Sequence, residues 1–367
     1  MDDQHLRAAF NLARLGRGQT SPNPHVGAVL VRDEEVVGRG FHTWEGVKHA
    51  EILALEQAGA RARGATLYIN LEPCSHQGRT PPCSDALIAA GVARVVVAQQ
   101  DPNPRVAGDG FRRLREAGIE VEVLREYAAE AERLNEAFCF FMRHQRPLVT
   151  LKSALTLDGK IAAPDDNAGW ITSEQARRHV QEIRHDSDAI LTGIGTVLAD
   201  NCRLTDRTGL PRSRPLLRMV LDSQLRLPLD SRMVTSANGD VVVVTTSASS
   251  KERRAALEAR GVRVLRFDGP GGRADLRQTI NWLAGEHYLS LMIEAGSKIN
   301  WNALESQLVD KVFFYYGAKI FGGIESLPMA GGIGRRRRVD AITVRDLQLH
   351  PIAPNEFAVE AYINKEL

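Results

Sequence analysis

Two short segments of the sequence carry residues that could bind a metal ion and use it in catalysis. The first is HAE at residues 49–51, and the second is EPCSHQGRTPPC at residues 72–83. Zinc prefers tetrahedral nitrogen and sulfur ligands, and a catalytic zinc site keeps one position open for water, so it needs three protein ligands. His49, Cys74 and Cys83 supply that number, and we interpret them as a zinc site.

Glu51 stands two residues after the histidine and is suited to carry protons beside the metal without binding it. This arrangement is similar to the H-x-E…P-C-x-x-C signature of zinc nucleobase deaminases, in which zinc-bound hydroxide attacks an amidine carbon while the glutamate shuttles protons. The signature has two residues between its cysteines, whereas eight residues separate Cys74 from Cys83. Both thiols can still bind the same metal ion if these eight residues form a loop that points outward. Two alternatives stay open, a closed zinc knuckle with His76 as fourth ligand and two unrelated buried cysteines.

Hydrophobic periodicity predicts the elements that must position these ligands. Helices are expected at residues 3–16, 49–59, 84–90, 111–118 and 128–143, and strands at residues 26–31, 36–41, 65–70, 93–98 and 119–124. This order predicts a three-layer α/β domain over residues 1–145. Because each cysteine follows a proline, we expect both at or near helix N-termini, where the helix dipole favours the thiolate.

The pattern restarts after a proline and predicts a second α/β domain over residues 146–367. Its strand signals include LVTLKSALTLDG, LMIEAG, KVFFYYGAKIFG, AITVRDLQLH and EFAVEAYI, while PRSRPL, TSANGD and FDGPGGR are typical of surface loops. The dinucleotide fingerprint G-x-G-x-x-G does not occur there. GIGTVLAD contributes only Gly193 and Gly195, a weak signal, so composition alone leaves this domain unassigned.

Composition excludes several classes of protein. A length of 367 residues favours two domains, and 47 basic against 45 acidic residues give no electrostatic footprint for nucleic acid. The four arginines at residues 335–338 are therefore interpreted as a solvated loop. The sequence has no long apolar run and no secretory leader at its start, so we expect a cytoplasmic protein without a membrane role, whose cysteines are reduced.

The first half resembles the deaminase half of the bifunctional riboflavin biosynthesis enzymes through SPNPHVGAVLV, GFHTWEGVKHAE, EPCSHQGRTPPC and DPNPRVAGDG. The resemblance implies a cytidine-deaminase-like fold, with the zinc ligands and the proton carrier at the positions given above. It also implies substrate contacts at Asn23 and His42, and it makes Arg79 a candidate contact for the substrate phosphate. The alternatives are a turn asparagine, a core histidine and a solvated arginine.

The second half resembles the reductase of the same pathway, whose fold is that of dihydrofolate reductase and whose cofactor is NADPH. LKSALTLDGKIA, GWITS, RHDSDAILTGIGTVLADNCRLTDR, VLDS and IEAG carry the resemblance. The implied cofactor contacts are Ala154, Trp170, Thr196, Asp200, Ser223 and Gly296. The implied substrate contacts are Lys152, Ala168, Arg184, Leu204, Arg207 and Glu294.

Each of these reductase residues has a plainer alternative, such as a core tryptophan, a helix cap or a surface ion pair. Lys152 and Glu294 are the leading candidates to assist catalysis, whereas Asp158 in the LDG turn is interpreted as stabilising that turn. The segment after Gly296, SKINWN, departs from the family's small apolar run, and Lys298 there is a further candidate for a phosphate contact.

The resemblance thus implies a bifunctional enzyme that first deaminates 2,5-diamino-6-(5-phosphoribosylamino)pyrimidin-4-one with zinc. It then reduces the ribosyl group of 5-amino-6-(5-phosphoribosylamino)uracil to ribityl with NADPH. We expect small-molecule partners and a homo-oligomer. The rival hypotheses are an RNA deaminase fused to an unrelated domain, and a nucleotide-binding or structural zinc protein without turnover.

Overall fold

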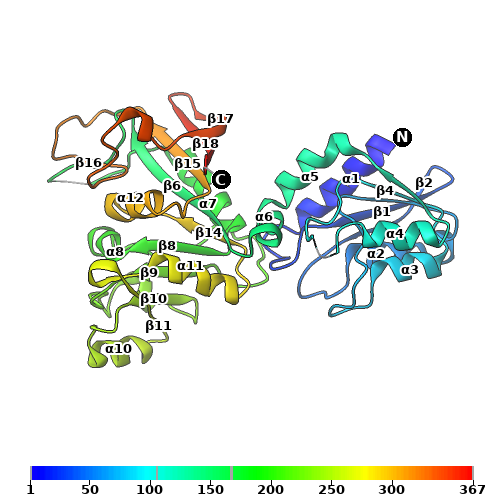
Figure 1. Ribbon diagram of the computed structural model, residues 1–367, viewed down its shortest axis with the longest axis horizontal. Coiled ribbons are helices and arrows are strands. Elements are labelled where there is room, and N and C mark those ends of the chain that lie inside the picture. The colour runs from blue at the N-terminus through cyan, green and yellow to red at the C-terminus, as the bar shows by residue number, and fades with distance from the viewer. Residues whose placement is uncertain (1, 105, 166–167, 366–367) are drawn as a thin grey trace. The chain divides into compact units, whose positions relative to one another are not determined.

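The computed structural model describes residues 2–104, 106–165 and 168–365, and the chain divides into two compact units (Figure 1). The first unit runs to Gln145 and includes Pro211–Arg214, and the second comprises Arg146–Leu210 and the chain from Pro215 onward. The backbone N–H of Ser213 donates to the carbonyl oxygen of Gly18 at 2.8 Å. Four residues that the sequence analysis places in the second domain therefore pack with the first.

The first unit is built on a five-stranded sheet with the strand order β2-β1-β3-β4-β5. β1 is antiparallel to β2 and β3, whereas β3, β4 and β5 are parallel to one another. The strands are β1 (Gly27–Arg32), β2 (Glu35–Phe41), β3 (Thr66–Ile69), β4 (Arg94–Val97) and β5 (Glu120–Val123).

Helices cover both faces of this sheet, so the predicted three layers are present. Buried side chains of α2, α3 and α4 form the core on one face, and those of α1 and α5 form the core on the other. The helices are α1 (Asp2–Leu15), α2 (Ala50–Ala58), α3 (Cys83–Ala90), α4 (Asp109–Glu116), α5 (Ala128–Leu134) and α6 (Glu136–His144), with 3-10 turns η1 (Gly59–Ala62) and η2 (Arg125–Tyr127).

Small residues bring α2 into backbone contact with the sheet. A Cβ atom on Gly38 would lie 2.1 Å from the carbonyl oxygen of Ala54, and one on Gly40 would lie 2.2 Å from that of Ala50. Only glycine on β2 permits this approach, and the alanines on α2 complete the close packing. The start of α2, which carries the HAE segment, is therefore fixed against the sheet.

One predicted helix of the first unit is broken. The sequence predicts a continuous helix over residues 128–143, but α5 ends at Leu134 and α6 begins at Glu136. Asn135 between them has φ −112° and ψ 28°, and its buried side chain bonds to the backbone of His25. Those tertiary hydrogen bonds outweigh the helical preference of the surrounding residues.

The second unit contains a nine-stranded sheet with the order β11-β10-β9-β8-β14-β6-β15-β18-β17. Strands from β11 to β15 in this order are parallel, and β18 and β17 extend the sheet by antiparallel pairing. The strands are β6 (Leu148–Thr156), β8 (Ala189–Gly193), β9 (Leu217–Leu221), β10 (Val241–Thr245), β11 (Arg263–Arg266), β14 (Ser290–Ile293), β15 (Lys311–Gly317), β17 (Val344–Ala353) and β18 (Glu356–Ile363).

Helices again cover both faces of the large sheet. The core on one face includes buried residues of α7, α8, α9 and α10, and the core on the other includes those of α11 and α12. The helices are α7 (Glu174–Asp186), α8 (Ile194–Asp200), α9 (Arg232–Thr235), α10 (Lys251–Glu258), α11 (Leu276–Gly285) and α12 (Ser297–Glu305).

Short elements lie in segments that the sequence predicts as loops or strand extensions. FDGPGGR forms a small hairpin, β12 (Asp268–Gly269) and β13 (Arg273–Ala274), around the turn η3 (Pro270–Gly272). β7 (Lys160–Ala162) pairs with β16 (Leu327–Pro328), and η4 (Arg338–Asp340) begins at the last residue of the arginine run. In the ranges that the structure describes, no helix is long and apolar enough to cross a membrane.

Candidate active sites

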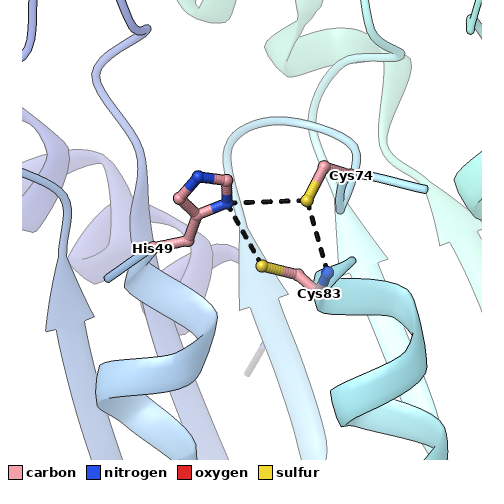
Figure 2. Close-up of side chains that lie close together, drawn as sticks. All are labelled: His49, Cys74 and Cys83. Atoms are coloured by element: carbon pink, nitrogen blue, oxygen red, sulfur yellow. Dashed lines mark hydrogen bonds between the residues drawn. The ribbon is translucent and has the colours of Figure 1, made fainter. Parts of the chain in front are cut away.

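Three side chains from separate segments of the first unit converge on one point. His49 is the N-cap residue of α2, Cys83 is the first residue of α3, and Cys74 lies in the loop that follows β3. The Nδ1 atom of His49 lies 3.2 Å from Sγ of Cys83 and 3.5 Å from Sγ of Cys74 (Figure 2). All three ligand atoms lie within 4.8 Å of one another.

These distances fit zinc. With Zn–N of about 2.0 Å and Zn–S of about 2.3 Å, tetrahedral geometry separates nitrogen and sulfur ligands by about 3.5 Å. Among the described residues these three form the group that could hold a metal ion, and His76 is exposed on the loop between the cysteines. The arrangement therefore supplies three ligands, the number that leaves a catalytic zinc one position for water.

The pKa values of the two thiols are shifted in opposite directions. A hydrogen bond from Cys83, helped by His49 and opposed by burial, lowers the pKa of Cys74 to about 4. The pKa of Cys83 is raised, because its thiol bonds to Cys74 and is buried. One proton thus leaves the pair easily, and a cation is needed to stabilise the second thiolate.

The position of Cys74 differs from the sequence expectation. Both cysteines were expected at or near helix N-termini, but only Cys83 begins a helix. Cys74 nevertheless receives the backbone N–H of Cys83 at 3.3 Å, so the free N–H group at the start of α3 stabilises its sulfur. The N-terminus of α3 therefore stabilises the sulfur of Cys74, although Cys74 lies in a loop and not on that helix.

Glu51 is the second residue of α2, and its side chain is buried beside the metal ligands. Burial, with a contribution from the charge of Cys74, raises the pKa of Glu51 to about 7. The carboxyl group also interacts with His49 and Cys83. A carboxyl group with such a pKa, close to the metal ligands, suits both accepting and donating a proton near neutral pH.

Asn23 and His42 meet next to the metal centre. The Nδ1 atom of His42 lies 3.0 Å from the carbonyl oxygen of Lys48, so Nδ1 carries the proton and Nε2 accepts from Nδ2 of Asn23 at 2.9 Å. Burial chiefly, then the charges of His49 and Arg79, lower the pKa of His42. The His42 ring stands edge-on to that of His49, with 5.3 Å between their centroids.

Three positioning residues of this site were missed from the sequence. Asn70 accepts the N–H of Gly27 at 2.9 Å and donates to the carbonyl oxygen of His25 at 2.8 Å, which fixes the segment after Asn23. Asn135 also binds the backbone of His25. Buried Glu72, two residues before Cys74, accepts the backbone N–H groups of Asp101, Gly108, Gly110 and Phe111 at 2.8–3.2 Å.

In the second unit, a cluster of charges joins three of the predicted residues. Lys152 lies on β6, Glu294 directly follows β14, and these strands are parallel neighbours with Ile293 opposite Leu151. The Nζ atom of Lys152 lies 3.0 Å from Oε1 of Glu294, and Nη2 of Arg184, on α7, lies 2.9 Å from Oε2.

The cluster is largely buried, with 7% of the Lys152 side chain, 8% of the Arg184 side chain and 23% of the Glu294 side chain exposed. Burial raises the pKa of Glu294, but the charges of Arg184 and Lys152 outweigh it and lower that pKa to about 2. Glu294 is therefore ionised and holds both cations near the C-terminal ends of parallel strands, where α/β proteins bind ligands.

Other predicted residues lie around this cluster. The pKa of Asp200 is raised by desolvation and by the charge of Glu294, and the pKa of Arg207 is lowered by desolvation and by the charge of Arg184. Both residues are therefore within electrostatic range of the cluster. A Cβ atom on Gly296 would lie 3.8 Å from Oγ1 of Thr196, so the starts of α8 and α12 face each other.

The remaining predicted residues make contacts of other kinds. Trp170 is 67% exposed, and the guanidinium carbon of Arg177 lies 4.7 Å from its ring centroid. Leu204 is buried in the core with φ 54°, and the hydroxyl of Ser223 accepts the N–H of Ala274 at 2.9 Å. Ala154 packs against the same core as Leu204, and Ala168 and Lys298 are exposed.

The start of α12 carries the predicted cofactor contact Gly296. Its N-cap residue, Gly296, provides no side-chain hydrogen bond, and the buried Oγ of Ser297 makes no hydrogen bond within the described residues. Free N–H groups at a helix N-terminus and a hydroxyl donor are the groups that bind the phosphates of a dinucleotide. Ser297 Oγ is enclosed next to Gly331, so an NADPH contact at this segment would use the backbone N–H groups, and it stays a prediction.

Sequence reasoning missed one further pair next to Lys152. The Nζ atom of Lys152 lies 5.8 Å from the ring centroid of Tyr315 on the neighbouring strand β15, and the Tyr315 hydroxyl lies 2.6 Å from Nδ1 of His179.

Asp158 makes the hydrogen bonds expected of a residue that stabilises the LDG turn. Its carboxylate accepts from the hydroxyl of Thr156 at 2.5 Å and from the N–H of Gly322 at 2.7 Å.

Family models match both units. The model described as the cytidine and deoxycytidylate deaminase zinc-binding region matches residues 1–99, and that of the RibD C-terminal domain matches residues 147–354. Together with the metal centre, these matches define a zinc-dependent deaminase joined to a reductase. The second match covers more than half of the chain, and the chain belongs to the family of the riboflavin biosynthesis protein RibD.

Relatives of known name support this assignment over nearly the whole length. The chain is 41% identical to RibD of Synechocystis sp. over 354 residues, which cover 96% of this chain and 94% of the relative. It is 41% identical to RibD of Escherichia coli (strain K12) over 369 residues, which cover 96% and 97%. The predicted enzyme of riboflavin biosynthesis, with a zinc-dependent deaminase and an NADPH-dependent reductase, is confirmed.

Solved structures agree with the fold. RibD of Acinetobacter baumannii (form 1) has a TM-score of 0.88 at 34% identity, with 99% of each chain covered. The diaminohydroxyphosphoribosylaminopyrimidine deaminase/5-amino-6-(5-phosphoribosylamino)uracil reductase of Thermotoga maritima has a TM-score of 0.83 at 34% identity, also with 99% of each chain covered. The predicted fold class, a cytidine-deaminase-like unit followed by a dihydrofolate-reductase-like unit, is confirmed.

Proposed function

We propose that the unit over residues 1–145 removes the 2-amino group of 2,5-diamino-6-(5-phosphoribosylamino)pyrimidin-4-one, and that the unit over residues 146–367 reduces the resulting phosphoribosylaminouracil. The observation that carries the proposal is the convergence of His49, Cys74 and Cys83 with the buried carboxyl group of Glu51 beside them. The names and lengths of the relatives support the choice of substrate.

In the deaminase, His49, Cys74 and Cys83 would hold zinc. Zinc, when bound, makes a coordinated water acidic enough to ionise near neutral pH. Glu51 accepts the proton of the attacking water and later delivers it to the departing amine, which leaves as ammonia.

Two further side chains orient the pyrimidine in this unit. Asn23 donates to His42, so its Oδ1 atom is available to accept from the pyrimidine edge. Arg79, on the exposed loop between the cysteines, contacts the substrate phosphate.

In the reductase, NADPH supplies the hydride that reaches C1′ of the ribosyl group. Thr196 near the start of α8 and Gly296 at the start of α12 would bind the cofactor, and so would Asp200 at the end of α8. The other proposed cofactor contacts are Ala154, Trp170 and Ser223. Lys152 and Arg184, held by Glu294, bind the hydroxyl groups and phosphate of the sugar chain. The remaining proposed substrate contacts are Arg207, Leu204 and Ala168.

We also propose that the protein is cytoplasmic and forms a homo-oligomer. The four free cysteines suit a reducing compartment. The strand β17 lies at the edge of the large sheet and exposes Leu347 and Leu349, by 56% and 65%, and such an apolar edge is a suitable surface for a second copy. Light scattering of the purified chain measures its mass and tests the homo-oligomer, which requires a mass that is a multiple of 40.4 kDa.

One incubation tests the two activities together. The purified protein receives zinc, the diaminopyrimidine substrate and NADPH, and ammonia release and NADPH loss are followed in parallel. Glu51→Gln should retain zinc but stop ammonia release, and it should still oxidise NADPH when the uracil intermediate is supplied. Lys152→Ala should impair only NADPH oxidation. Loss of both activities in either folded variant would refute two separate sites.

A further inference from the structure

Two loops beside the metal centre are joined by an aromatic contact. Trp44 lies in the loop between β2 and α2, and Arg79 lies in the loop between the two cysteine ligands. The guanidinium carbon of Arg79 is 4.2 Å from the centroid of the Trp44 ring, well inside the limit of about 6 Å for a cation–π contact. Its Nη1 also donates to the carbonyl oxygen of Trp44 at 3.5 Å.

The loop that carries Trp44 is itself fixed. The backbone N–H of Trp44 donates to the carbonyl oxygen of Gln19 at 2.8 Å, and Nδ1 of His42 lies 3.0 Å from the carbonyl oxygen of Lys48, which closes the loop. Trp44 is half-buried, whereas Arg79 is exposed. The indole ring is therefore a support, fixed through its backbone, against which the longer and more exposed arginine side chain lies.

The Trp44–Arg79 contact joins the two loops that carry binding residues of this unit. Trp44 is two residues after His42, and Arg79 lies in the loop between the metal ligands Cys74 and Cys83. His42 in turn bonds to Asn23 at 2.9 Å and stands 5.3 Å from the ring of His49. The arginine is therefore held against the loop that begins at His42, one of the residues proposed to hold the pyrimidine.

The cation–π contact leaves the guanidinium group able to bind an anion. The contact keeps the positive charge and does not use the N–H donors, which can bind a phosphate. Apart from the bond to Trp44, Arg79 makes no hydrogen bond within the described residues. Lys48, the other cation of these loops, is paired with Glu56 at 2.7 Å. Within the described residues of these two loops, Arg79 is therefore the cation that has no carboxylate partner.

We propose that Trp44 is a positioning residue that holds Arg79 ready for the 5-phosphate of the substrate and so makes the deaminase prefer phosphorylated over unphosphorylated pyrimidines. This inference rests on the proposed deaminase function. Without Trp44, the arginine side chain must lose its rotational freedom when the substrate binds, which weakens affinity for the phosphate without affecting the reacting atoms.

The test uses the full zinc-loaded chain with Trp44→Leu, Trp44→Phe and Arg79→Met. Ammonia release is measured with the phosphorylated substrate and with the same compound lacking the phosphate. Trp44→Leu should raise the KM for the phosphorylated substrate about tenfold, which corresponds to about 1.4 kcal/mol. Its kcat and its KM for the unphosphorylated compound should change less than about twofold. Trp44→Phe, which keeps an aromatic face, should restore most of the affinity.

Arg79→Met should raise the same KM at least as much, and adding Trp44→Leu to it should have little further effect, since the two residues act as one unit. An equal rise in KM for both substrates, a fall in kcat, or no change would overturn the role of Trp44. Binding of the phosphorylated substrate to Glu51→Gln, with and without Trp44→Leu, is measured by calorimetry and does not need turnover. A wild-type chain that releases no ammonia would instead refute the proposed deaminase function and the ligand assigned to Arg79.

Discussion

Asn135 holds both backbone polar groups of His25. Its Oδ1 atom accepts the N–H of His25 at 2.7 Å, and its Nδ2 atom donates to the carbonyl oxygen at 3.0 Å. The carboxamide therefore replaces a neighbouring strand for the residue two positions after Asn23. Because Asn135 is buried and interrupts a helix to make these bonds, the segment that carries Asn23 is fixed from a part of the chain more than a hundred residues away.

Asn135→Asp should impair deamination more than reduction. The carboxylate cannot donate to the carbonyl oxygen of His25, and it places a charge in a buried position, so we expect a loss of about 2–3 kcal/mol in the free energy of unfolding of the first unit. Deaminase kcat/KM should fall about tenfold, because Asn23 loses its support. Asn11→Asp, an exposed change on α1, is the control. Unchanged deamination by Asn135→Asp would contradict the role of this contact.

Glu72→Gln should destabilise the first unit strongly. The carboxylate accepts four backbone N–H groups at 2.8–3.2 Å, whereas glutamine offers one oxygen and turns an NH₂ group towards the other donors. Leaving buried donors without partners costs about 1–3 kcal/mol each, so we expect a loss of about 3 kcal/mol. Urea denaturation followed by circular dichroism measures it.

The matched control for this change is Glu116→Gln. Glu116 is 63% exposed and pairs with Arg112 four residues earlier, so its substitution should change stability by less than about 0.5 kcal/mol. Equal effects of the two substitutions would show that the hydrogen bonds of Glu72 contribute no more than a surface ion pair.

The zinc site could be predicted because its ligands lie in two short segments of the sequence. His49, Cys74 and Cys83 are recognised by residue type and by short spacings, and Glu51 by its position two residues after the histidine. Asn70, Glu72 and Asn135 could not be predicted in the same way. Each is an ordinary polar residue in the sequence, and its partners are backbone groups brought close only by the sheet topology.

The reductase site illustrates the same limit. Lys152, Arg184 and Glu294 come from β6, α7 and the end of β14, which are distant in the sequence and adjacent only because β14 and β6 pair in parallel. Their assignment came from resemblance to a family, and spacing alone leaves them as possible surface ion pairs. Tyr315, which packs beside Lys152, had no signal because buried tyrosines on strands are common.

Removal of zinc should separate the two activities. A chelator should abolish ammonia release and lower the melting temperature of the first unit, since the ligands lose the cation that stabilises the second thiolate. Oxidation of NADPH with the uracil intermediate should continue. Metal analysis should give one zinc per chain for wild type and less than about a tenth of that for Cys83→Ala.

Cys139→Ala is the control for zinc content. Burial raises the pKa of Cys139 to about 12, so it remains a thiol and should not be a ligand. Its substitution should leave one zinc per chain. A chelator that stops both activities, or a loss of zinc from Cys139→Ala, would contradict a metal site confined to the three proposed ligands.

The acid sensitivity of the second unit should depend on Glu294. Arg184 and Lys152, against the opposing effect of burial, lower its pKa from the ordinary 4.5 to about 2. A carboxyl group whose pKa is lower in the folded state stabilises the fold fully above its unfolded pKa, and this stabilisation is lost as pH falls towards the folded pKa. The lowering corresponds to about 3 kcal/mol at neutral pH. Glu294→Gln should therefore be less stable at pH 7 by about that amount, and the two proteins should converge as the pH falls from about 5 towards 3.

Three of the four tryptophans, Trp170, Trp282 and Trp301, lie in this unit, so urea denaturation followed by tryptophan fluorescence reports mainly on it. Glu174→Gln, whose carboxylate is 72% exposed beside Arg178, should show no such pH-dependent difference. If the gap between wild type and Glu294→Gln stays constant down to pH 3, its source is packing and not the ionised carboxylate.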